Sequence, residues 1–509
     1  MPRMLAKLLN LVGACSMSAG GSVQAQKPQI LAGWQGVPFN RTTLVVLLTV
    51  LLGLASGMTI LLALGEYNTL WLVGLLLLTT YTAIAVARRL AALVFLICAF
   101  IEFWGAVPEA YQIGPIKLID VIAGAAILPL VVELIRRGFP FHGSVRKRLS
   151  LAANLLLVLV IGEVLLTTLS TGQDLWQTIK AGKPYFYYFG FLLVPVYAGT
   201  AEKVRQLVQW VTIASAVLAG IYLLASLLGE SSVLPGLVVG QARFIGLGSF
   251  TRVRSLGAPF IVAMFLLQFY RMVEGRASKM DKIAVIILAL GIIVHSYRSV
   301  WAGILGGIFL QSCMEGRRGA QSLGKLLAVL LILLGGISAI HPEYTKMILA
   351  RGASALTEVE EGSGSYGVRQ EQVKSWQPIL AENWIAGIGF LHHDSPFGQR
   401  LEALYGMAGT GNYDVGWIDI LGRLGVCGSM LFCVFLYYLT KGVWTRQAYR
   451  RRGELTCMRR TVAAYTLAGI ISLPGFPLLS YAGGVFPLAL LAGMMAVYEE
   501  DVEPTLAGD

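Results

Sequence analysis

Long runs of Leu, Val, Ile and Ala alternate along the chain with short polar connections. Crossing the hydrocarbon of a membrane takes about 20 apolar residues per helix, with every backbone N–H and C=O bonded inside the helix. The chain lacks the segments of alternating polarity that are typical of a transmembrane β-strand. The pattern therefore predicts an all-α, polytopic helical membrane protein with about 14 (12–14) transmembrane helices and one long extracytoplasmic loop.

The expected helices fall on both sides of one long polar stretch. We expect a cytoplasmic N-terminal segment at 1–42, transmembrane helices 1–11 within 43–340, a large loop with short helices at 341–413, helices 12–14 within 414–498, and an acidic cytoplasmic tail at 499–509. The individual spans are expected at 43–64, 69–87, 90–107, 116–135, 150–170, 184–200, 204–229, 257–271, 282–297, 299–313, 322–340, 414–440, 460–479 and 482–498.

The polar stretch 341–413 is where a membrane protein could hold a water-soluble reaction partner. A Gly/Ser hinge at Gly362 to Ser365 precedes a candidate helix around Val368 to Leu380. One apolar stripe of that helix consists of Val373, Trp376 and Leu380. We therefore expect an ordered lid or half-domain, because a disordered linker has no use for such a stripe.

Composition and charge narrow the class further. The 509 residues are 56% hydrophobic and 13% charged, whereas typical soluble chains carry about 25% charged residues. The net charge of +12 raises the possibility of a nucleic-acid partner, but basic clusters at helix ends are orientation signals in membrane proteins, so we expect none. The six cysteines contain no CxxC pair, and we expect neither a disulfide framework nor a zinc site.

Basic residues mark every second connection, for example Arg88 and Arg89, Arg146 to Arg148, and Arg450 to Arg452. Connections rich in Lys and Arg stay in the cytoplasm. Both chain ends are therefore expected in the cytoplasm, the N-terminal segment uncleaved, and the loop 341–413 outside.

Several arginines lie on the external side of this topology. Arg298 is the sharpest case, because it separates two apolar runs, and an unpaired arginine at the membrane edge costs up to roughly 3 kcal/mol. It therefore needs an anion nearby. The other external arginines that are candidates to bind an anion are Arg252, Arg254 and Arg369. Snorkelling to lipid headgroups is one explanation, but guanidinium forks suit phosphate oxygens, which favours a lipid-linked phosphate or diphosphate as the ligand.

Three motifs carry a resemblance to the O-antigen ligase and Wzy-type polysaccharide polymerase superfamily of bacterial glycan assembly. They are "HSYRSVW", "RQEQVKSWQPILAENWIAGIGF" and "NYDVGWIDILGRLGVCG". The resemblance implies a metal-independent glycosyltransferase of the inner membrane, with its active site facing the periplasm and an undecaprenyl-diphosphate-linked oligosaccharide as donor. Membrane lipid and other polysaccharide assembly proteins are the further partners it implies.

The branch of the superfamily stays open. Where the family's ligases carry His, Asn and Glu, this chain has Asp414, Val415 and Arg423. Asp414 is more similar to the polymerase branch, which we prefer over a ligase that transfers glycan to lipid A core or another acceptor. A lipid-linked oligosaccharide flippase is a third reading, but the external arginines crowd near one loop rather than along a path through many helices.

The expected chemistry needs a base for the acceptor hydroxyl and charge stabilisation for the leaving diphosphate. We expect Arg298 and Arg254, supported by Arg252 and Arg369, to bind the diphosphate. Asp414 is the first candidate for the base, although an Asp before a helix also serves as an N-cap, and His393 and His392 come second, although they can equally be a solvated loop pair. No carboxylate or third histidine has ligand spacing, so no metal and no cofactor are expected. The acidic run Glu358, Glu360 and Glu361 is expected to be an exposed loop.

Overall fold

The structure is a computed structural model, and it describes residues 112–113, 116–117, 141, 143–228, 243–247, 250–254, 257–295, 297–340, 342–405, 415–444, 449 and 453–506. The chain divides into two compact units, Met1–Val73 and Gly74–Asp509, and every described residue belongs to the second. The expected N-terminal segment and the spans 43–64, 69–87 and 90–107 lie outside the described residues, as does nearly all of 116–135.

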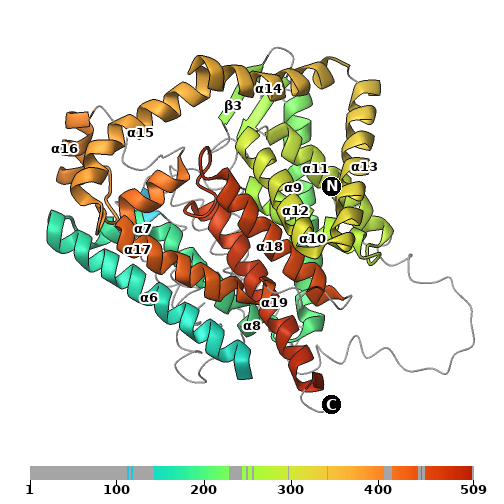
Figure 1. Ribbon diagram of the computed structural model, residues 1–509, viewed down its shortest axis with the longest axis horizontal. Helices are drawn as coiled ribbons and strands as arrows, with labels where there is room; N and C mark the ends of the chain where they lie inside the picture. Colours follow the sequence, from blue (N-terminus) through green and yellow to red (C-terminus); the bar gives the residue numbers. More distant parts are fainter. Residues whose placement is uncertain are drawn as a thin grey trace, which may run out of the picture. The chain divides into compact units, whose positions relative to one another are not determined.

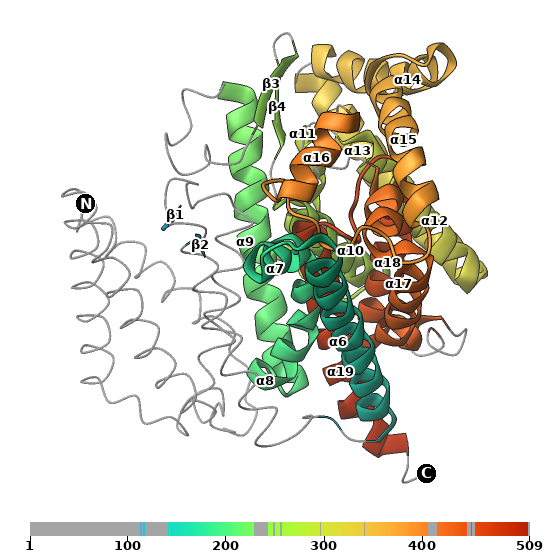
Figure 2. The ribbon, with the colours of Figure 1, turned by 90° about the vertical axis from the view of Figure 1, so that its left-hand side faces the viewer.

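Helices make up most of the described chain (Figures 1 and 2). They are α6 (Gly143–Thr171), α7 (Leu175–Phe186), α8 (Leu193–Tyr197), α9 (Ala201–Leu228), α10 (Ala258–Val273), α11 (Lys279–His295), α12 (Arg298–Glu315), α13 (Arg317–Ile340), α14 (Pro342–Glu361), α15 (Gly364–Asn383), α16 (Pro396–Tyr405), α17 (Gly416–Thr440), α18 (Glu454–Ser472) and α19 (Ala482–Leu506), with short 3-10 helices η2 (Tyr187–Leu192) and η4 (Lys441–Val443). Two antiparallel hairpins complete the set: β1 (Gln112–Ile113) with β2 (Ile116–Lys117), and β3 (Arg243–Leu247) with β4 (Phe250–Arg254).

Five of the described helices are long and apolar enough to cross a membrane. They are α6, α9, α13, α17 and α19, and α10 is a shorter apolar helix. This confirms the helical membrane class, while the number of 14 spans stays a prediction. The expected span 184–200 is divided among the end of α7, the 3-10 helix η2 and α8, and Pro184 inside α7 removes a helical hydrogen bond there.

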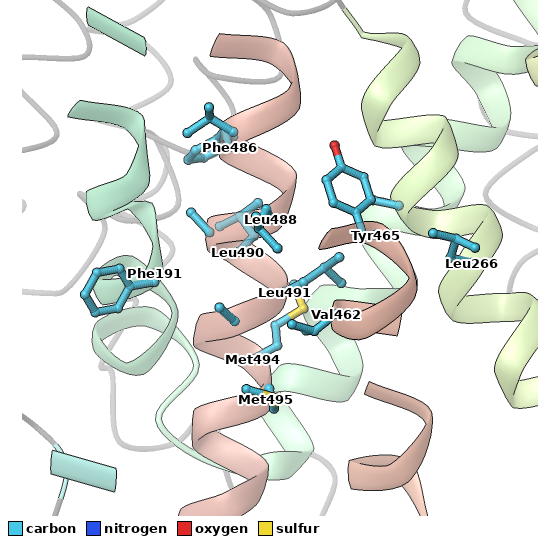
Figure 3. Packing of buried hydrophobic residues seen from close by; sticks show 14 of the residues in the cluster. Phe191, Leu266, Val462, Tyr465, Phe486, Leu488, Leu490, Leu491, Met494 and Met495 are labelled. Carbon is cyan, nitrogen blue, oxygen red and sulfur yellow. The ribbon is translucent and has the colours of Figure 1, made fainter. Parts of the chain in front are cut away.

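Helix α19 lies at the centre of the hydrophobic core. Residues 483–499 are all buried, and the helix contacts η2, α8, α10 and α18. Figure 3 shows Phe486, Leu490 and Met494 along α19, with Phe191 of η2 on one flank and Tyr465 of α18 on the other. A helix that is apolar on every side is either enclosed by other helices or covered by lipid, and α19 is enclosed, since its side chains at 483–499 are all buried.

Helices α12 and α18 pack at very short range because two glycines of α12 face α18. A Cβ added at Gly303 would lie 2.6 Å from the carbonyl oxygen of Ala468, and one added at Gly307 would lie 2.5 Å from that of Ala464. Small residues four apart allow helix backbones to approach closely in membrane proteins. The Gly-x-x-x-Gly spacing therefore fixes the register of the two helices.

Buried ion pairs hold the ends of several helices. Glu499 accepts from Arg148 at 2.6 Å and from Arg459 at 3.0 Å, so it joins α19 to α6 and α18. The expected tail at 499–509 therefore does not begin as a free segment: α19 continues to Leu506, because Glu499 is neutralised by two arginines within the fold.

The side chain of Arg460, in α18, is 2% exposed. It pairs with Glu274 of the α10–α11 connection at 2.6 Å and with Glu315 of α12 at 2.5 Å. A desolvated arginine needs such partners. Arg460 therefore contributes to helix packing as well as to the charge balance of the connections.

Three helices form the described part of the polar loop, and two of them, α14 and α15, have 20 residues each, longer than the short helices expected there. The expected hinge is the turn between them, where Gly362 and Gly364 have φ values of +62° and +59°. The expected apolar stripe is present: Trp376 is 2% exposed, and Val373 and Leu380 pack in the same cluster. The stripe packs on α17, where Gly422 leaves room for the Trp376 ring.

Helix α17 is broken at Gly425, whose φ and ψ are 60° and −170°. The chain that follows α15 fills the break. Trp384 and Ile385 accept, through their carbonyl oxygens, from the N–H groups of Val426 (2.8 Å) and Cys427 (3.1 Å). On the other side of the break, the carbonyl oxygens of Gly422 and Arg423 accept from the N–H groups of Ile388 and Gly389, both at 2.8 Å. The docked segment 384–389 therefore satisfies backbone groups that the break would leave unpaired.

Candidate functional site

Arg298 begins α12, and its guanidinium group reaches the turn between α14 and α15. Nη2 donates to Glu358 Oε2 at 2.7 Å and to Ser365 Oγ at 2.8 Å, and Nη1 donates to Ser354 Oγ at 3.0 Å. The anion that the sequence required beside Arg298 is thus present, and it is a carboxylate of the chain itself.

The Glu358 carboxylate occupies a site built for a negative charge. Besides Arg298, its Oε2 atom accepts from the backbone N–H of Ser365 at 3.2 Å and from Ser365 Oγ at 2.9 Å, in the first turn of α15. The hydrogen bond from Arg298, followed by that from Ser365, lowers the pKa of Glu358 from 4.5 to about 2. Glu358 is therefore ionised at neutral pH and is a weak base. Glu360 and Glu361 are exposed, as expected, but the acidic run forms the last turn of helix α14 and not a loop.

A second arginine meets the same region through the turn Leu473–Pro477, which follows α18 and which we name the hub turn. The carbonyl oxygen of Gly475 accepts from Arg369 Nη2 at 3.0 Å and from Ser299 Oγ at 3.1 Å. Ser299 is the residue after Arg298. The structure therefore brings Arg298 of α12 and Arg369 of α15 to one site, although they are far apart in the sequence.

The start of α17 lies on the hub turn as well. The N–H of Gly416 donates to the carbonyl oxygen of Leu473 at 2.7 Å, and Gly416 packs against Pro477. Asp414 lies outside the described residues, two positions before Gly416. The hub turn is thus the element against which Ser299, Arg369 and the chain next to Asp414 all pack.

Arg252 and Arg254 lie on β4, and their side chains are outside the described part of the structure. Arg252 pairs with Ile245 and Arg254 with Arg243 in the hairpin register. Residues two apart in a strand share one face. Strand β4 contacts α9 and α11, and α11 ends three residues before Arg298. The hairpin therefore packs on the helix that precedes α12 in the chain.

His392 and His393 lie elsewhere. Their rings stack at 4.5 Å, and the N–H of His392 donates to Gln173 Oε1, in the α6–α7 connection, at 2.8 Å. Burial, the neighbouring His393 and Lys180 lower the pKa of His392, against the opposing effect of Asp394, so the imidazole is neutral at pH 7. Helix α15, about 30 Å long, separates these histidines from the turn that holds Arg298. No contact among the described residues joins them to Arg298.

The expectation that no carboxylate accompanies the histidines at ligand spacing is corrected by Asp394. Ligand atoms of His392, His393 and Asp394 lie within 4.8 Å of one another, and His393 Nε2 is 3.2 Å from Asp394 Oδ1. Sequence spacing rules for zinc look for separated ligands, and they miss three consecutive residues that fold onto one another. These three side chains are the ones in the described chain that could hold a metal ion, and Asp394 and His393 are more than half exposed.

Two further polar features were not expected from the sequence. The first is the hub turn, for which "LPGFP" was the available signal, because Pro and Gly between two apolar runs indicate a turn. The second is a buried pair inside α17, where Arg423 Nε donates to Asp419 Oδ1 at 2.6 Å and Nη1 donates to the carbonyl oxygen of Ala181 at 2.8 Å. Their spacing of four residues was the available signal for that pair.

No protein-family model matches this sequence, and no curated protein matches it.

Proposed function

We propose that the protein is an integral membrane glycosyltransferase. It polymerises undecaprenyl-diphosphate-linked repeat units into exopolysaccharide or O-antigen on the periplasmic face of the bacterial inner membrane. The observation that supports this function is the convergence at the hub turn: Ser299, beside Arg298, and Arg369 bond one carbonyl oxygen, and the chain next to Asp414 packs on the same turn.

In this mechanism Arg298 and Arg369 stabilise the charge that develops on the diphosphate as the bond to the sugar breaks. Guanidinium groups suit this task, because their planar donors match phosphate oxygens and they stay charged at every working pH. Arg252 and Arg254 are the supporting candidates. The diphosphate is already a good leaving group, so the reaction as proposed requires no metal.

Asp414 is the proposed base that accepts the proton of the acceptor hydroxyl. Glu358 is unsuited to this role, because its low pKa makes it a poor proton acceptor. His392 is neutral and could accept a proton, but it contacts the α6–α7 connection rather than the hub turn. Because the chain next to Asp414 packs on the hub turn, we favour Asp414 over His392 and His393 as the base.

The test expresses Arg298→Ala, Arg369→Ala and Asp414→Asn separately in the producing cell and separates the polysaccharide by gel electrophoresis. A polymerase that has lost activity leaves single repeat units. Loss of a ligase would leave long chains on the lipid carrier, and loss of a flippase would leave repeat units in the cytoplasmic leaflet. Either of these two patterns would replace the proposed function.

Arg400→Ala is the matched control. Arg400 is an exposed arginine of α16 in the same loop, so the substitution removes one external positive charge without touching the hub turn. We expect normal chain lengths from this variant. Equal losses of polymerisation in Arg400→Ala and Arg298→Ala would mean that the activity depends on the total positive charge of the loop. The contacts at the hub turn would then not be responsible for it.

A further inference from the structure

The segment that fills the break in α17 can be placed relative to the membrane by counting along that helix. Just beyond the far end of α17, Gly442 of η4 faces Arg148, since a Cβ added there would lie 2.9 Å from Arg148 Nη1. Arg148 pairs with Glu499, and such paired charges at the end of a spanning helix mark one boundary of the hydrocarbon.

The helix between Gly442 and Gly425 is about 25 Å long at 1.5 Å per residue. The hydrocarbon core of a bilayer is about 30 Å thick. Gly425 therefore lies within a few ångströms of the opposite boundary. Because the carbonyl oxygens of Trp384 and Ile385 bond the N–H groups of Val426 and Cys427, the backbone of this segment lies at the same depth.

The side chains of the docked segment at this depth point away from the protein. Trp384 is 57% exposed and Ile385 is 52% exposed, whereas Ile379 and Trp376, about one and two turns earlier in α15, are buried against the protein. Beside them, Val426 and Met430 are exposed on α17, a helix long and apolar enough to span the membrane. The apolar surface of the segment is thus continuous with the surface of a candidate spanning helix.

We propose that Trp384 and Ile385 form an interfacial anchor that inserts into the lipid boundary on the side where α14, α15 and α16 lie (Figure 2). The partner is the phospholipid bilayer. Irregular backbone is tolerated at the edge of hydrocarbon only when its polar groups are satisfied by protein, which the four hydrogen bonds across the break achieve. Tryptophan is enriched at this depth, where its ring is in lipid and its N–H reaches the headgroups.

The anchor changes how the polar loop is held. Helix α15 starts at the turn that Arg298 contacts and ends at Asn383, immediately before the anchor. The helix is therefore fixed by an ion pair at one end and by the membrane at the other, and it is not a freely solvated lid. This inference does not depend on the proposed enzymatic activity.

The test measures the depth of a spin label. In the full chain with its six cysteines replaced by serine or alanine, Ile385→Cys carries a nitroxide and is reconstituted in phosphatidylcholine vesicles. We expect collisions with oxygen, which concentrates in lipid, to exceed collisions with a water-soluble nickel chelate, as at the lipid-facing control Met430→Cys. The aqueous control Arg400→Cys should show the reverse ratio. A label at 385 that behaves like the one at 400 would overturn the proposal.

A second measurement keeps the six natural cysteines and makes one conservative substitution, Trp384→Phe. The part of the tryptophan fluorescence that disappears in Trp384→Phe should be quenched by lipids brominated near the headgroup and protected from a water-soluble quencher. The opposite preference would also overturn the anchor. This measurement covers the case in which the cysteine-free chain fails to elute as a single folded species.

Discussion

Arg298 donates from Nη2 to Glu358 Oε2 at 2.7 Å, and this contact fastens the first residue of α12 to the last turn of α14. The carboxylate occupies the position in which a phosphate oxygen of the proposed donor would contact the guanidinium group. In the proposed mechanism the two anions compete for Arg298, and we expect the loop turn to move away from Arg298 when the donor binds. Arg298 has both a structural partner and a proposed ligand.

Replacing Glu358 by Gln should strengthen binding of inorganic pyrophosphate, used as a probe for the diphosphate. The substitution keeps the size of the side chain and removes the competing charge, so we expect an affinity several-fold higher by isothermal titration. The stability should fall by about 1 to 3 kcal/mol, because only about a quarter of each side chain is exposed and the Arg298 charge loses its counter-ion. Glu360→Gln, an exposed neighbour, should change neither quantity. Unchanged pyrophosphate affinity in Glu358→Gln would show that the anions do not compete.

The same pair predicts a pH dependence of stability. The pKa of Glu358 is about 2 in the fold and 4.5 as its ordinary value. The ion pair therefore stabilises the fold above pH 4.5, and this contribution is lost as the pH falls from 4.5 towards 2. The difference in thermal midpoint between the natural chain and Glu358→Gln should shrink over that window. A difference that stays constant would mean that the carboxylate is not held by Arg298 in solution.

The break in α17 predicts a strong effect of one methyl group. Gly425 has φ +60°, and a Cβ there would collide with the carbonyl group of Ile385. Gly425→Ala should therefore lower the stability by at least about 1 to 2 kcal/mol from backbone conformation alone, and more from the collision. Gly162→Ala is the control, because nothing lies within 4 Å of its added Cβ, and it should be neutral or slightly stabilising.

Thermal unfolding in detergent compares the two alanine variants. Equal midpoints for Gly425→Ala and Gly162→Ala would mean that α17 continues through position 425 without the break. Such a result would also remove the docking site of the segment 384–389.

The buried ion pair of Asp419 and Arg423 predicts that removing one charge destabilises the fold more than removing both. Both side chains are at least nine-tenths buried, so Arg423→Met leaves an uncompensated carboxylate and should cost about 3 to 5 kcal/mol. The double variant Asp419→Leu with Arg423→Met removes both charges and should recover part of that loss. Chemical denaturation or thermal midpoints in one detergent would measure the cycle. A double variant less stable than Arg423→Met would contradict the assignment of the loss to the orphaned charge.

Local patterns in the sequence predicted the structural features that depend only on residues close to one another in the chain. The apolar runs gave the helical membrane class, and the stripe of Val373, Trp376 and Leu380 identified the buried face of α15. The cost of an unpaired arginine at the membrane edge was sufficient to require an anion beside Arg298. Each of these arguments uses residues within one helix or the energy of one group.

Reasoning from local patterns could not predict contacts between segments that are far apart in the sequence. Glu358 is 60 residues from Arg298 in the chain, and as part of an acidic run it resembled a solvated loop. The break at Gly425 becomes visible only when the segment from Trp384 docks into it, because glycine within an apolar run is common in membrane helices. The hub turn is defined by donors from α12, α15 and α17, which no single stretch of sequence reveals.

The choice of base gives the last prediction. Asp414 is next to the chain that packs on the hub turn, whereas His392 bonds Gln173 at the other end of α15. Asp414→Asn should therefore reduce the polymerisation rate by about 10²- to 10⁴-fold, the usual contribution of a general base, while leaving pyrophosphate affinity unchanged. His392→Gln and His393→Gln should retain activity, and a metal chelator should have no effect on it. Activity that survives Asp414→Asn but is lost in His392→Gln, or is lost on chelation, would move the chemistry to the His392, His393 and Asp394 cluster.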